Sequence, residues 1–113
     1  MARKKKKRRV EERPRELLLP AEGQVVGVVE RLVGAEHAIV KCSDGYSRMC
    51  RIPGRMRRRV WIKEGDVVLV AIWDFQPTKK GDIIHRYERD EIKKLVEMNY
   101  IPRELLEEMG VSI

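Results

Sequence analysis

The segment Gln24–Val33 reads QVVGVVERLV, and its composition decides which fold to expect. Five of its ten residues are valine, a β-branched residue that is favoured in strands. Gly27 stands near its centre, where a glycine usually marks a bend or a bulge. Such a bend is typical of a strand that pairs on both sides of a small barrel. The segment therefore predicts a bent first strand.

Four more segments of strand composition follow, separated by turn signals. Asp44-Gly45 is a strong hairpin signal, and Pro53-Gly54 ends another segment. The continuously apolar run VVLVAIW is expected to be the most buried of the strands. The four expected strands are His37–Cys42, Tyr46–Ile52, Val67–Trp73 and Asp82–Tyr87.

The pattern changes to a helical period after residue 89. Ile92, Leu95 and Val96 would form the apolar face of one short helix, and a second would run from Pro102 to Gly110. Both helices are too short to be stable unless they pack on the barrel. Residues 1–15 show no apolar periodicity and carry nine Lys or Arg, so we expect a disordered basic tail.

These segments predict a mainly β protein. Five short strands without a long helix between them indicate a five-stranded antiparallel barrel of the oligonucleotide/oligosaccharide-binding (OB) class, with short C-terminal helices and a disordered basic N-terminal tail. An SH3-like barrel fits the strand count almost as well. We expect a flexible tail at 1–20, an RNA-binding barrel at 21–88 and a helical extension packed on the barrel at 89–113.

The charge is distributed unevenly along the 113 residues. The chain has 25 Lys or Arg and 18 Asp or Glu, a net charge of +7, and the tail alone accounts for that excess. Within the balanced remainder, Tyr46–Lys63 holds seven bases and no acid. A folded domain with one basic patch favours a polyanion that approaches from one side. No secretory signal or membrane-spanning run is visible, so we expect a cytoplasmic protein without a membrane partner.

Catalysis and metal binding find little support in the sequence. No serine lies in a Gly-x-Ser-x-Gly elbow, and no Gly-rich phosphate loop is present. The spacing of Cys42 and Cys50 fits no zinc pattern, and we expect two reduced thiols on adjacent strands. The sequence thus predicts no enzyme, no cofactor and no metal.

The stretch CRIPGRMRRRVWI, residues 50–62, places five arginines within nine positions; we call residues 53–61 the arginine loop. Crowded like charges repel one another, whereas arginine suits bidentate contact with phosphate and stacking on bases. A solvated surface turn is the alternative interpretation. Met56 is expected to anchor the loop in the barrel, with a wedge against a displaced base as the alternative. Trp73 is expected in the core, and Trp61 either there or stacked on a base.

The chain resembles the translation initiation factor 1A family of archaea and eukaryotes, which is related to bacterial initiation factor 1. The motifs that carry the resemblance are DG at 44–45, RMCRIPGRMRRRVWI at 48–62, GDVVLVAIWDFQ at 65–76 and KGDIIHRYERDE at 80–91. The resemblance implies an OB barrel that binds the decoding A site of the small ribosomal subunit. There it would block premature tRNA entry and promote recruitment of initiator tRNA and mRNA, without chemistry of its own.

The resemblance also implies partners and contact residues. The partners would be rRNA of the small subunit, the initiator-tRNA ternary complex and other initiation factors, bound by a monomer. Eukaryotic members end in a long acidic tail, and an end at Ile113 is typical of an archaeal-type factor. The residues expected to contact RNA, some from the resemblance and some from the OB face, are Lys41, Arg48, Arg51, Arg55, Met56, Arg57, Arg58, Arg59, Trp61, Lys79, Lys80 and Arg86. Non-specific contacts are expected from Lys4, Lys5, Lys6, Lys7, Arg8 and Arg9.

Two other classes of function stay open at this stage. A general single-strand RNA binder of the cold-shock type would need exposed aromatic residues on the second and third strands, where Tyr46 is the only candidate. A protein-interaction module would use the acidic C-terminal helices instead.

Overall fold

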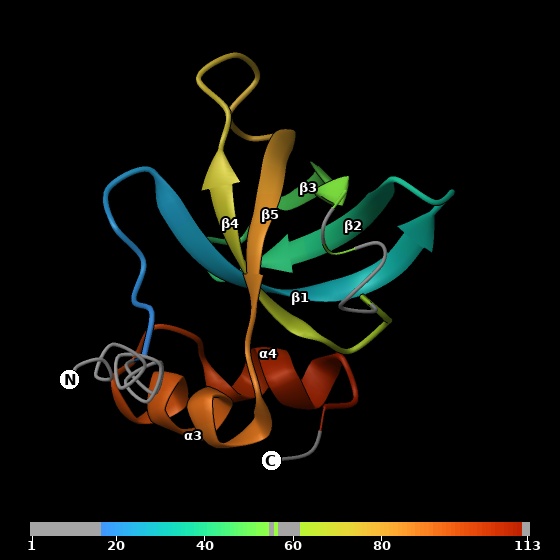
Figure 1. The fold of residues 1–113 in the computed structure, drawn as a ribbon. Helices are drawn as coiled ribbons and strands as arrows, with labels where there is room; N and C mark the ends of the chain where they lie inside the picture. Colours follow the sequence, from blue (N-terminus) through green and yellow to red (C-terminus); the bar gives the residue numbers. More distant parts are fainter. Residues whose placement is uncertain (1–16, 55, 57–61, 112–113) are drawn as a thin grey trace, which may run out of the picture.

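The computed structural model describes residues 17–54, 56 and 62–111. Its sheet is formed by β1 (Gln24–Val33), β2 (His37–Cys42), β3 (Ser47–Arg51), β4 (Val67–Ile72) and β5 (Lys80–Arg86). The helices α3 (Arg89–Glu97) and α4 (Arg103–Glu108) follow and lie together at one end of the molecule (Figure 1). The predicted strands agree with these bounds to within two residues at each end.

The five strands form a closed barrel in the order β1-β2-β3-β5-β4. Neighbouring strands are antiparallel except β3 and β5, which pair in parallel from Met49↔Lys80 to Arg51↔Asp82. The prediction of a wholly antiparallel barrel was therefore wrong at this pair. The reason is geometric, because an odd number of strands in a closed ring cannot alternate in direction all the way round.

Gly27 lies where β1 pairs with both β2 and β4, as the sequence predicted for a strand that serves both sides of a barrel. A Cβ atom at this position would lie 2.6 Å from Cγ1 of Val40 and 2.9 Å from the carbonyl oxygen of Lys41. The register of β1 against β2 shifts just beyond it, between Val29 and Arg31. Glycine thus allows β2 to cross close to β1 where the barrel closes.

Two apolar cores lie on the two sides of the barrel wall. Val68 and Val70 of β4 point into the barrel, while Val67 and Leu69 point outward and are covered by the helices. All four are buried, as the sequence predicted for this run, whereas Ala71 and Ile72 at its end are half-buried. The inner core consists of Val25, Val29, Ala38, Val40, Cys42, Cys50, Ile52, Met56, Ile62, Val68, Val70 and Ile83. The outer core consists of Val26, Val28, Val67, Leu69, Tyr87, Ile92, Leu95, Ile101, Leu105 and Leu106.

The chain that leads into β1 packs on the outer core. Leu17 and Leu19 contact that core, and the hydroxyl of Tyr87 donates a hydrogen bond to the carbonyl oxygen of Leu18. Burial raises the pKa of Tyr87 to about 12, so this hydroxyl keeps its proton at neutral pH. Residues 17–19 therefore pack against the barrel, although the sequence assigned them to the flexible tail.

Cys42 and Cys50 are free thiols buried inside the barrel, as the sequence predicted. Within the described ranges, no three side chains of His, Cys, Asp or Glu gather in a way that could hold a metal ion. No helix in that part of the chain is long and apolar enough to span a bilayer.

Candidate nucleic-acid interface

The outer surface of β2, β3 and β5 presents side chains in rows that cross the strands, because alternate residues of a strand point to opposite sides. Ala38, Val40 and Cys50 point into the inner core, so their neighbours along the strands point outward. Three rows result: Lys41 with Ser47, Ile39 with Met49 and Lys80, and His37 with Arg51 and Asp82. We call this surface the β2–β3–β5 face.

The β2–β3–β5 face carries an excess of positive charge. Its bases are Lys41, Arg51 and Lys80, and its acid is Asp82. Lys79 precedes β5 and is exposed, and its carbonyl oxygen accepts a hydrogen bond of 2.8 Å from the backbone N–H of Met49. The fold thus brings four predicted contact residues from two distant segments, Lys41, Arg51, Lys79 and Lys80, to one region of the surface.

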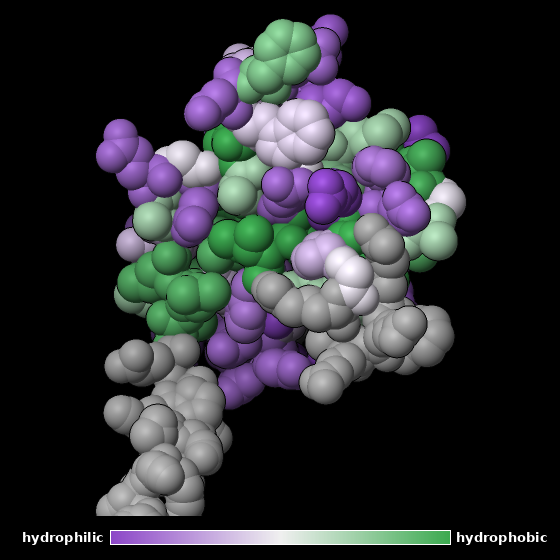
Figure 2. All heavy atoms as spheres, turned by 45° about the horizontal axis from the view of Figure 1, so that its top comes forward, coloured by the Kyte–Doolittle hydropathy of each residue, from purple (hydrophilic) through white to green (hydrophobic). Residues whose placement is uncertain are grey.

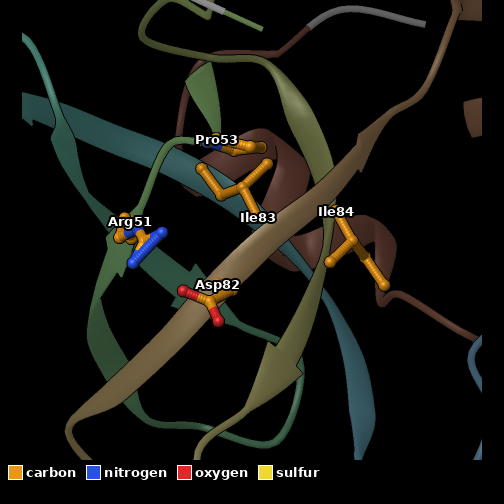
Figure 3. Close-up of a pocket in the computed structure, with 5 residues that line it drawn as sticks. All are labelled: Arg51, Pro53, Asp82, Ile83 and Ile84. Carbon is orange, nitrogen blue, oxygen red and sulfur yellow. The ribbon is translucent and has the colours of Figure 1, made fainter. Parts of the chain in front are cut away.

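A pocket of about 200 Å³ lies where β3 and β5 run side by side (Figure 3). Arg51, Pro53, Asp82, Ile83 and Ile84 line it, and the side chains of Arg51 and Asp82 lie next to each other. Oδ1 of Asp82 is buried and has no hydrogen-bond partner among the residues that the structure describes. The pocket therefore joins an arginine and a carboxylate to an apolar wall, at the point where β3 leads into the arginine loop.

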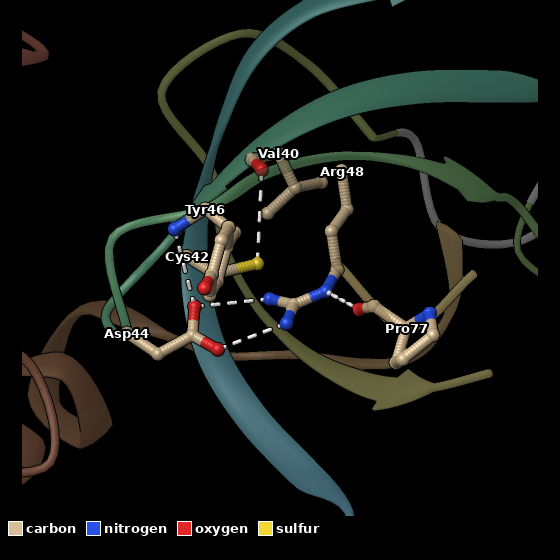
Figure 4. A network of polar contacts seen from close by, with 6 residues as sticks. All are labelled: Val40, Cys42, Asp44, Tyr46, Arg48 and Pro77. Carbon is tan, nitrogen blue, oxygen red and sulfur yellow. Dashed lines mark hydrogen bonds and ion pairs between the residues drawn. The ribbon is translucent and has the colours of Figure 1, made fainter. Parts of the chain in front are cut away.

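Arg48 occupies a place that the sequence did not predict. Its side chain points inward and is buried, and Nη1 and Nη2 donate hydrogen bonds of 3.0 and 2.9 Å to the two carboxylate oxygens of Asp44 (Figure 4). Nε donates a third, of 2.7 Å, to the carbonyl oxygen of Pro77. The guanidinium also lies 5.4 Å from the centre of the Tyr46 ring. Arg48 therefore ties the β2–β3 turn to the β4–β5 loop; a direct contact with RNA stays a prediction.

Both members of this ion pair are charged at neutral pH. The hydrogen bonds from Arg48 hold the pKa of Asp44 below its usual value, and those bonds likewise raise the pKa of Arg48 above its own. The sequence analysis counted Arg48 among bases that have no nearby acid, because it interpreted Asp44 only as a turn residue of a hairpin. The i, i+4 spacing across a tight turn is the signal that could have identified the pair.

The β4–β5 loop stands away from the barrel (Figure 1). Trp73 was expected in the core, but this was wrong: β4 ends at Ile72, the chain leaves the sheet there, and Trp73 is 37% exposed. Phe75, which the sequence interpretation passed over, is 73% exposed. Its signal was an aromatic residue set among turn-forming residues. Figure 2, which looks onto this end, shows hydrophilic side chains around a protruding apolar one.

The remaining predicted contacts fall into three groups. Met56 is 6% exposed and belongs to the inner core, as expected of an anchor of the loop, and its contact with RNA stays a prediction. Arg86 lies at the helix end of β5, with Nη2 3.4 Å from Oε2 of Glu88. The predicted contacts that lie outside the described residues are Lys4, Lys5, Lys6, Lys7, Arg8, Arg9, Arg55, Arg57, Arg58, Arg59 and Trp61.

A closed barrel of five strands in this order, with helices packed against the outside of β1 and β4, defines a mainly β protein of the OB class. The family model described as Translation initiation factor 1A / IF-1 matches residues 14–110. This chain therefore belongs to the translation initiation factor 1A / IF-1 family, and the resemblance found in its motifs is confirmed.

Individual relatives agree with the family match. Translation initiation factor 1A of Metallosphaera sedula is 52% identical over 105 residues, which cover 92% of this chain and 96% of the relative. The factor of the same name from Saccharolobus solfataricus is 50% identical over the same shares. Among solved structures, the solution structure of a translation initiation factor 1 from the Wolbachia endosymbiont of Brugia malayi is 28% identical, covers 76% of this chain and 97% of that one, and gives a TM-score of 0.46.

Proposed function

We propose that this initiation factor binds rRNA of the small ribosomal subunit at the decoding A site. In this position it blocks tRNA entry and promotes recruitment of initiator tRNA and mRNA, and it performs no chemical step. The observation that carries the proposal is the β2–β3–β5 face, where Lys41, Arg51 and Lys80 lie on one side of an OB barrel. Membership of an initiation-factor family supports the choice of a ribosomal partner.

The ends of the arginine loop are held by the inner core. Ile52 is 4% exposed before the loop and Ile62 is 8% exposed after it, while Met56 is buried between them. Four arginines, Arg55, Arg57, Arg58 and Arg59, therefore belong to a short span of chain between two residues that are fixed in the barrel. Their mutual repulsion favours a polyanion that neutralises them.

Binding of this kind depends on phosphate neutralisation. Each phosphate contact with Lys or Arg releases counterions, so affinity should fall steeply as salt is raised. Unpaired bases at a folded RNA site would add stacking on guanidinium planes and aromatic rings. The pocket beside Arg51 offers a second kind of contact, since it can receive a polar group against an apolar wall.

The test is binding of the full chain to intact small subunits, in competition with an A-site ligand. We expect mutual exclusion for the unaltered chain. The triple variant Arg57→Glu, Arg58→Glu, Arg59→Glu should lose roughly a hundredfold or more in affinity, because three phosphate contacts are lost and three like charges are added. A matched control makes the same charge change on the helices, Lys93→Glu, Lys94→Glu, Arg103→Glu, all three exposed positions, and should bind within a fewfold of the unaltered chain.

Three outcomes separate the candidate functions. Simultaneous binding with the A-site ligand would exclude the A site as the position of the factor. Equal affinity for naked RNA oligomers and for subunits would favour a general single-strand binder. Loss of binding in the helix control alone would favour an interaction module that uses α3 and α4.

A further inference from the structure

Phe75 is the most exposed large apolar side chain in the part of the chain that the structure describes. Its exposed fraction is 73%, compared with 50% for Met98 and 48% for Tyr46. A phenylalanine in this position leaves most of its ring in water, which gives up the stabilisation that burial of the ring would provide. The ring is therefore available to a partner that can cover it.

The loop that carries Phe75 is braced at several points. Gln76 adopts a left-handed backbone conformation with φ of 57°, and its carbonyl oxygen accepts the N–H groups of Lys79 and Lys80, both at 3.0 Å. The buried guanidinium of Arg48 holds the carbonyl oxygen of Pro77. Together with the hydrogen bond of 3.3 Å from the N–H of Trp73 to the carbonyl oxygen of Lys80, these contacts hold the backbone on both sides of Phe75, so the ring is presented without a large entropic cost at the moment of binding.

The surroundings of Phe75 favour RNA over protein as the partner. Asp74 and Lys79 are exposed on the same loop and Lys80 begins the next strand, so bases outnumber acids by two to one there, and the charge of Asp44 is already matched by Arg48. The exposed apolar area is one ring, with part of Trp73 two positions earlier in the chain, whereas a stable protein interface buries about 800 Å² on each partner. A single ring on a loop with a small excess of cations fits a flat apolar surface attached to a polyanion, which is a nucleobase on its strand.

We propose that Phe75 is a stacking site for an unpaired RNA base, with Lys79 neutralising the adjoining phosphate and the Arg48–Pro77 contact positioning the loop. The inference rests on the proposed function and deepens it, because it assigns a second contact on the same RNA partner. The arginine loop and the face supply attraction that salt weakens. Phe75 supplies an attraction that salt leaves nearly unchanged, since stacking involves no counterion release.

The experiment measures affinity against salt for small subunits and for a single-stranded RNA oligomer that carries 2-aminopurine. Phe75→Leu keeps the apolar character but removes the aromatic plane. We expect its affinity to fall about tenfold at every salt concentration, within the range of base stacking on one ring. Phe75→Trp should restore binding and quench 2-aminopurine. Lys79→Gln should reduce the steepness of the salt dependence by roughly 0.7 to 0.9 in logarithmic slope.

Met98→Leu, which alters an exposed apolar residue next to α3, is the control and should leave affinity unchanged. If Phe75→Leu binds subunits and the oligomer as tightly as the parent chain does, the stacking site is overturned. The proposed function still stands in that case if the parent chain competes with an A-site ligand. Loss of subunit binding in both Phe75→Leu and Phe75→Trp, with oligomer binding intact, would assign the ring to a protein and also overturn it. If the parent chain does not bind subunits, but stacking on the oligomer is still lost in Phe75→Leu, the proposed function is contradicted and the stacking site is retained.

Discussion

Arg48 and Asp44 form a bidentate ion pair whose two members differ sharply in exposure. The side chain of Arg48 is 3% exposed and that of Asp44 is 36% exposed, although the two residues are only four positions apart in the chain. A buried cation that loses its partner cannot recover the hydration that folding removed, whereas a carboxylate at the surface can. The two halves of the pair are therefore not equivalent.

Asp44→Asn should destabilise the fold more than Arg48→Met. The first change leaves a buried guanidinium without its counter-charge, and loss of one partner of a buried pair typically costs about 3 kcal/mol or more. The second leaves a carboxylate that water can reach and places an apolar chain in an apolar wall, at a cost of about 1 kcal/mol. Urea unfolding followed by circular dichroism measures both, and the opposite ranking would show that the Pro77 contact outweighs the Asp44 contact.

The stability contributed by Asp44 should depend on pH in a defined direction. Its pKa in the folded state is lowered by Arg48, so the folded state holds this proton less tightly than the unfolded chain does. The stabilisation is therefore complete above the pKa of an aspartate in the unfolded chain, which is about 4. It is lost as the pH falls through the lower pKa that Asp44 has in the folded protein. The difference in unfolding free energy between the unaltered chain and Asp44→Asn should be constant from pH 5 to 7 and shrink below about pH 4. A difference that stays constant to pH 2 would contradict this role.

Gly27→Ala should weaken the barrel where β1 crosses β2. The added methyl group would meet Cγ1 of Val40 at 2.6 Å and the backbone oxygen of Lys41 at 2.9 Å, and a backbone atom cannot move aside as a side-chain tip can. We expect a loss of about 2 kcal/mol, in the range of overpacked cores. Gly54→Ala is the matched control, because a Cβ there meets nothing within 4 Å. Thermal unfolding of the two variants tests the contrast, and equal melting temperatures would refute the close crossing.

The two cysteines should react with thiol reagents only when the barrel opens. Burial raises the pKa of Cys50 to about 12 and also raises the pKa of Cys42 above its usual value. Both groups are therefore protonated and inaccessible at pH 8, and the thiolate is the reactive form. Labelling with a chromogenic disulfide should be slow in buffer and rapid above the unfolding midpoint in urea. Stoichiometric labelling of the native protein within seconds would contradict the assignment of these side chains to the inner core.

Local patterns predicted most of the sheet, because valine-rich runs, Asp44-Gly45 and Pro53-Gly54 act within a few residues of one another. The parallel pairing of β3 with β5 depends on closure of the whole ring, and no short segment contains that information. The same holds at the candidate interface. The sequence assigned Lys41, Arg48 and Arg51 to the ligand face of the barrel, but strand alternation turns only Lys41 and Arg51 outward.

Prediction failed where a residue's role depends on a partner from another loop. Arg48 was counted with the surface arginines, because the carbonyl oxygen that receives its Nε belongs to Pro77, 29 residues later. Trp73 was assigned to the core since it continues an apolar run, yet the strand ends one residue earlier. Phe75 carried no periodic signal, and its turn-forming neighbours were the one local sign that it lies on a loop and not in a strand.

Strand β4 serves as a wall shared by two compartments, with Val68 and Val70 facing one and Val67 and Leu69 facing the other. Removal of α3 and α4 would leave a strip of bare valine and leucine on the outside of the barrel. Such a stripe of exposed apolar side chains would favour self-association. In this chain the short C-terminal helices therefore cover the apolar outer side of β1 and β4, whereas the bases Lys41 and Arg51 lie outside this cover.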